Sequence, residues 1–106
     1  EIITLSQMLK KANKEAQLFA DVEDGGTCNF DSVVLNLKGK RSTFIQQLEN
    51  ESGFSFSKLS GSYWSGGYFV NFAVSGQGER RTKMAETACK FLKENGIDAS
   101  MYYAMD

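Results

Sequence analysis

The spacing of the apolar residues changes repeatedly along this chain, and these changes limit the fold more than any other feature of the sequence. Over residues 4–19, apolar side chains recur every three or four positions with lysines on the other side, which predicts an amphipathic helix. The acidic and glycine-rich residues 21–26 predict a turn. Residues 27–37 then hold apolar side chains at alternating positions, which predicts a strand with one strongly apolar face.

After residue 37, helical spacing and alternating spacing of the apolar residues follow each other again. Further elements are expected in the order helix, strand, strand, helix, strand, at about residues 40–52, 54–57, 68–74, 79–95 and from 97 onward. Gly53 and Gly96 follow the two helical segments, and glycine tolerates the left-handed backbone that ends a helix. The glycine- and serine-rich residues 60–67 predict a hairpin connection between the two central strands.

This order of elements predicts an α+β fold. A helix is followed by a βαββαβ run, which is the ferredoxin-like arrangement with a four-stranded antiparallel sheet. Right-handed connections would place both later helices on one face of the sheet and leave the other face open. We expect the N-terminal helix, within residues 1–20, to cover that open face or to pack against a second copy. We expect one domain over residues 1–106, with residues 27–106 as its βαββαβ core.

The composition is that of an ordinary soluble domain. The 106 residues are 42% hydrophobic and 24% charged, and 12 basic against 13 acidic side chains leave a net charge of -1. No apolar run approaches the roughly 20 residues that span a bilayer. The opening residues 1–7 lack the basic start and apolar stretch of a secretory signal. We therefore expect a cytoplasmic protein, a monomer or homodimer, with no membrane contact.

The chain contains no histidine. Histidine is the commonest general base and the commonest metal ligand, so hydrolases that work through histidine and zinc sites with histidine ligands are excluded. The two cysteines, Cys28 and Cys89, are far apart and are expected to be free thiols. These features favour a non-catalytic binding protein without cofactor or metal over a histidine-free enzyme.

Two basic groups mark candidate anion sites. Residues 76–83 open the last helix, where the glycines leave backbone amides exposed and three cations oppose the helix dipole unless an anion compensates them. A second basic group follows the first strand. The candidate residues are Gly76, Gly78, Arg80, Arg81 and Lys83 in the first group and Lys38, Lys40 and Arg41 in the second. We expect both groups at one edge of the fold, as a common patch; the alternative is an ordinary solvated surface.

Tyr63 and Trp64 are candidate contact residues in the expected hairpin. Large rings among serines and glycines provide much contact area at little entropic cost. The alternative is that Trp64 folds back onto the edge of the sheet, because partial burial is usual for tryptophan.

Residues 66–72 resemble the third strand of the RNA-recognition motif. They keep its first glycine and the pattern Phe69, Val70 and Phe72, whereas Ser65 replaces the basic residue and Gly67 the first aromatic residue. The expected first strand has no stacking ring. Binding of RNA or single-stranded nucleic acid is therefore the alternative function.

Three segments together resemble small uncharacterised accessory proteins of bacterial phages and mobile elements, namely residues 26–31, 76–86 and 101–106. This resemblance implies an accessory role, in which the protein inhibits a host defence protein or sequesters a phosphate-bearing small molecule. We accordingly expect a host protein or a phosphate-bearing small molecule as the partner.

Overall fold

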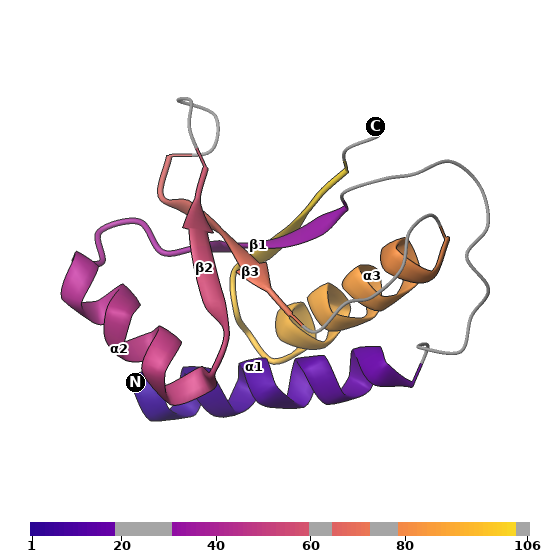
Figure 1. The fold of residues 1–106 in the computed structure, drawn as a ribbon, viewed down its shortest axis with the longest axis horizontal. Helices are drawn as coiled ribbons and strands as arrows, with labels where there is room; N and C mark the ends of the chain where they lie inside the picture. The colour runs from indigo at the N-terminus through magenta and orange to yellow at the C-terminus, as the bar shows by residue number, and fades with distance from the viewer. Residues whose placement is uncertain (19–30, 60–64, 73–78, 104–106) are drawn as a thin grey trace.

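The computed structural model describes four stretches of the chain, residues 1–18, 31–59, 65–72 and 79–103 (Figure 1). Their elements are α1 (Ile2–Gln17), β1 (Ser32–Asn36), α2 (Ser42–Ser52), β2 (Ser55–Lys58), β3 (Gly67–Asn71), α3 (Glu79–Glu94) and β4 (Ala99–Tyr102). The predicted α+β class and order of elements are confirmed. The predicted strand over residues 27–37 is shorter than expected, with residues 27–30 outside the described part, and β3 ends at Asn71.

The four strands form one antiparallel sheet in the order β2-β3-β1-β4. The central strand β1 pairs with β3 on one side and β4 on the other, so that Val34 lies opposite both Phe69 and Ser100. Strands β2 and β4 are the two edges of the sheet.

The core lies between one face of the sheet and the helices (Figure 1). Alternate strand residues belong to this core, among them Val33, Leu35, Val70 and Ala99, and all four are at most 4% exposed. They pack with Leu48 of α2 and Leu92 of α3. We call the opposite surface the open face.

Helix α1 does not cover the open face, contrary to our first expectation. It lies against α2 and α3, on the same side of the sheet as these helices (Figure 1). Its buried stripe holds Leu9, Ala12 and Ala16, each 0% exposed, and the two alanines let the helices approach closely. The open face offers this stripe little apolar surface to pack on, because serine and asparagine occupy much of it, as at Ser57 and Asn71.

The three described helices have 11 to 16 residues. No helix in the described part of the chain is long and apolar enough to cross a membrane.

Candidate functional site

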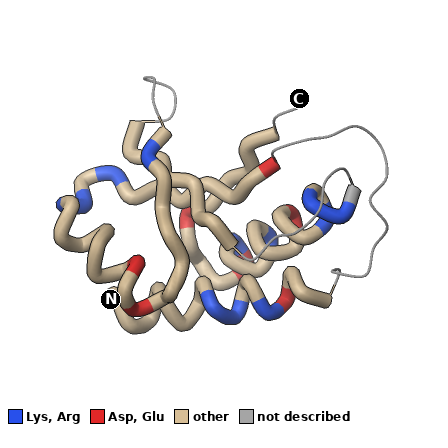
Figure 2. Tube along the Cα trace, viewed as in Figure 1, with Lys and Arg blue, Asp and Glu red and all other residues tan. Residues whose placement is uncertain are grey.

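The two basic groups lie at opposite ends of the sheet, so the expected common patch is wrong. Lys38 follows the carboxyl end of β1, and α3 follows the carboxyl end of β3. Since β1 and β3 are antiparallel, these two ends point in opposite directions. Figure 2 shows basic residues before α2 at one end of the molecule and at the start of α3 at the other.

Side chains at the start of α3 form hydrogen bonds with residues at the beginning of β1. Arg81 donates from Nε to the carbonyl oxygen of Asp31 at 3.0 Å and from Nη2 to Ser32 Oγ at 3.2 Å. Thr82 Oγ1 donates to Asp31 Oδ2 at 2.6 Å, and Asp31 is only 6% exposed. These bonds fasten the first turn of α3 to the beginning of β1.

Thr82 thus holds the Asp31 carboxylate at the beginning of α3, where the helix dipole favours negative charge. Arg81 contacts the Asp31 carbonyl oxygen and the Ser32 hydroxyl, so it joins α3 to β1 through neutral groups. Arg80 and Lys83 also have partners. Gly76 and Gly78 lie outside the described residues.

At the other end, a hollow of about 370 Å³ is surrounded by lysines. Lys38 and Lys40 come from the turn between β1 and α2, and Lys58 ends β2. Leu37, Leu59 and Tyr68 add an apolar and aromatic wall, and no described lining residue is acidic. We call this site the basic hollow. Lys58 was not among the predicted site residues, because only the pairing of β2 with β3 brings it beside the turn.

Backbone contacts hold the turn that presents two of these lysines. Leu37 N donates to Gly66 O at 2.8 Å, Lys38 N to Asn36 Oδ1 at 3.1 Å, and Lys40 N to Leu37 O at 3.0 Å. Gly66 has φ +81°, and a Cβ there would stand 2.6 Å from Lys38 Cβ. The turn is thus fixed by hydrogen bonds and by close packing against a glycine.

The basic hollow keeps unneutralised charge. Lys40 Nζ lies 3.2 Å from Glu1 Oε1 and 4.8 Å from the centre of the Phe44 ring. Lys38, Lys58 and the adjacent, exposed Arg41 form no ion pair with any acid of residues 1–18, 31–59, 65–72 or 79–103. Arg41 is also the N-cap of α2, and no side chain caps that helix. Its first backbone N–H groups therefore add to the positive potential.

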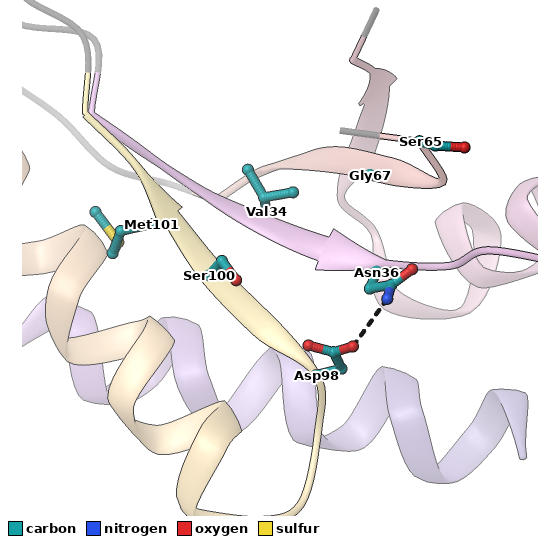
Figure 3. Close-up of a pocket in the computed structure, with 7 residues that line it drawn as sticks. All are labelled: Val34, Asn36, Ser65, Gly67, Asp98, Ser100 and Met101. Atoms are coloured by element: carbon teal, nitrogen blue, oxygen red, sulfur yellow. Dashed lines mark hydrogen bonds between the residues drawn. The ribbon is translucent and has the colours of Figure 1, made fainter. Parts of the chain in front are cut away.

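A second hollow, of about 310 Å³, lies on the open face (Figure 3). Asn36 Nδ2 donates to Asp98 Oδ2 at 2.9 Å, while Asn36 Oδ1 accepts from Lys38 N. The amide is therefore held in one orientation. Gly67, opposite Asn36 in the register, brings no side chain and leaves a depression. The Asp98 carboxylate makes this hollow unsuitable for an anion.

The open face is poorly equipped to bind nucleic acid. Phe69 does lie there, as the resemblance to the RNA-recognition motif implies. Its ring packs edge-to-face against Tyr102, with centroids 5.2 Å apart, which occupies part of its surface. Among the described strand residues on this face there is no lysine or arginine. Stacking rings interleaved with cations, the usual arrangement for single strands, are therefore missing from this part of the structure.

The remaining candidates divide between the core and the part of the chain that is not described. Cys89 is a free thiol, 2% exposed, and burial raises its pKa, which disfavours a reactive thiolate. Tyr63, Trp64 and Cys28 lie outside the described residues.

Comparison with family models, curated proteins and solved structures yields no match for this chain.

Proposed function

We propose that this chain is a non-catalytic binding protein that takes a phosphate-bearing ligand in the basic hollow. The observation that carries the proposal is the grouping of Lys38, Lys40 and Lys58 around one hollow without an acid among its described lining residues. The uncapped start of α2 supports it, because exposed N–H groups and the helix dipole favour anions.

A compact phosphate suits this hollow better than an extended acidic surface does. The three lysines line one limited volume from two segments, and Lys38 and Lys58 form no ion pair with a described acid, so a multiply charged group can contact both of them at once. Tyr68 and the two leucines offer contact to an apolar or ring-bearing part of the ligand. An acidic segment of a host protein is the other partner class, and the same experiment distinguishes it.

The test is isothermal titration calorimetry with ATP, pyrophosphate and a poly-glutamate peptide. We expect binding of a phosphate probe that weakens at least about tenfold in the double variant Lys38→Glu/Lys58→Glu, since each charged contact contributes about 1.5–3 kcal/mol. The matched control reverses two cations at the other end, in Arg80→Glu/Lys83→Glu, and should bind as the wild type does.

Three results would contradict the proposal. The first is equal loss in both double variants, which would indicate general charge attraction. The second is binding of the peptide alone, which would move the partner to the protein class. The third is no binding of any probe at low ionic strength, where charge attraction is strongest.

We also infer that the later six elements are a variant of the ferredoxin-like arrangement, extended by α1. The βαββαβ order, the antiparallel pairing and the helices on one face support this inference. The accessory role in a phage or mobile element remains a prediction from resemblance. Sequestration of a phosphate-bearing molecule would agree with it.

A further inference from the structure

The two edges of the sheet differ in how their outward backbone groups are treated. In an antiparallel ladder, alternate residues of an edge strand turn both N–H and C=O away from the sheet. Leu59 N donates to Gly67 O, so the odd-numbered residues of β2 form the backbone hydrogen bonds to β3. The backbone N–H and C=O groups of Phe56 and Lys58 therefore point away from the sheet. Asn36 N donates to Asp98 O, so the backbone N–H and C=O groups of Ala99 and Met101 in β4 point away from the sheet.

Side chains of α2 close the β2 edge. Glu49 Oε2 accepts the outward N–H of Phe56 at 2.7 Å, and Ser52 Oγ accepts the N–H of Phe54 at 3.2 Å. Lys58 adds a charge to the same edge. Capped donors and a lysine are usual ways of preventing an edge strand from pairing with another chain.

Among the described residues, none protects the carboxyl end of the β4 edge in this way. No hydrogen bond within the described chain uses the outward backbone groups of Met101 or of Tyr103, the next outward residue. Residues 99–103 contain no charged side chain and no proline. Tyr103 is 61% exposed, one of the largest exposed apolar side chains that the structure describes.

The burial along β4 determines which part can pair. Ala99 is 4% exposed, so the amino end of the strand is covered, whereas Met101 and Tyr102 are half-buried and Tyr103 is exposed. An antiparallel partner strand therefore has access only to the outward groups of Met101 and Tyr103. Tyr103 is held close to its own subunit, because its hydroxyl donates to Glu86 Oε2 at 2.6 Å.

We propose that β4 pairs with β4 of a second copy of this chain, antiparallel and with the two-fold axis at Tyr102. In this register Met101 of each copy faces Tyr103 of the other, and four hydrogen bonds satisfy their outward N–H and C=O groups. The two Tyr102 residues form the central non-hydrogen-bonded pair, where Cα atoms are about 4.5 Å apart. Each Tyr102 ring already packs against Phe69, so the pairing joins two aromatic pairs on the open face.

A second copy fits this edge because the pairing is isologous, so each copy offers the other the same outward backbone groups of Met101 and Tyr103. Residues 99–103 carry no charge, so no like charges face each other within this segment. The closed β2 edge stops the sheet from growing further, so the product is a dimer and not a fibre. A contact this short falls below the roughly 1,200 Å² of a stable interface, so the dimer is reversible.

Sedimentation velocity over a concentration series tests the proposal. The wild-type mass should rise from monomer towards dimer. Tyr102→Glu and Tyr102→Lys should each stay monomeric, because each places like charges at the axis, and their equimolar mixture should dimerise again. The matched controls, Ser57→Glu and Ser57→Lys on β2, should dimerise as the wild type does.

Hydrogen exchange of the wild-type protein gives a second measurement, which does not depend on whether a variant folds. Amide exchange at Met101 and Tyr103 should slow as the concentration rises, while exchange at Lys58 should not change. A monomer at all concentrations up to about 1 mM would overturn the proposal. So would dimers in both Tyr102 variants, or concentration-dependent protection at Lys58 instead.

Discussion

Thr82 and Thr87 lie on the same helix, yet their hydroxyls do different things. Thr82 Oγ1 donates to the buried Asp31 carboxylate at 2.6 Å, whereas Thr87 Oγ1 donates to Lys83 O one turn earlier. We expect Thr82→Ala to lower the free energy of unfolding by about 1–3 kcal/mol, because it takes a donor from a buried charge. Thr87→Ala should change it by less than about 0.5 kcal/mol. Urea unfolding measures both, and equal losses would contradict the role given to Asp31.

The cations at the start of α3 and their unfavourable position against the helix dipole can be recognised in the sequence. The carboxylate that lies there cannot, because Asp31 is 51 positions away from Thr82. Helix dipoles and local charge can be recognised within a few consecutive residues. The distant residue that interacts with them depends on how the chain folds. The same limit hid Lys58, whose place beside the turn of Lys38 follows only from strand pairing.

At the scale of elements, Gly66 and Gly53 allow the cost of a left-handed backbone to be distinguished from the cost of a steric clash. Both have φ +81°, but a Cβ at Gly53 would meet nothing within 4 Å, whereas at Gly66 it would meet backbone atoms of Lys38 below 3.0 Å. Gly53→Ala should cost about 1–2 kcal/mol, the usual penalty for this conformation. Gly66→Ala should cost more and displace the turn at Lys38.

Thermal unfolding compares the two variants, and phosphate titration reports on the turn. The Gly66 variant should bind the phosphate probe of the basic hollow more weakly, while the Gly53 variant should bind it as the wild type does. Similar stability and similar binding in both would mean that the contact of Gly66 with Lys38 does not hold the turn.

The elements themselves were predictable because periodicity is a local property. The helix of residues 4–19 and the strands around Leu35 and Val70 were all found from apolar spacing, with errors of a few residues at the ends. The expected common basic patch failed for a different reason. It required the directions of β1 and β3 to be compared, and their antiparallel pairing places the two junctions at opposite ends.

At the scale of the whole molecule, α1 belongs to the core and not to a detachable layer. Leu9 is 0% exposed against α2 and α3, while Leu18, at the end of the same helix, is 72% exposed. Leu9→Ala should cost about 2–5 kcal/mol, a large part of the roughly 5–15 kcal/mol of a small domain. Leu18→Ala should cost less than about 0.5 kcal/mol.

Because α1 joins both other helices, the loss in Leu9→Ala should lower the stability of every element together. Urea unfolding followed by far-ultraviolet circular dichroism and by the nuclear magnetic resonance signals of the β1 amides should therefore shift to the same lower midpoint by both measurements. Separate transitions, with α1 melting before an intact sheet, would show that α1 is an appendage. They would also restore the idea that its apolar stripe serves a surface outside this domain.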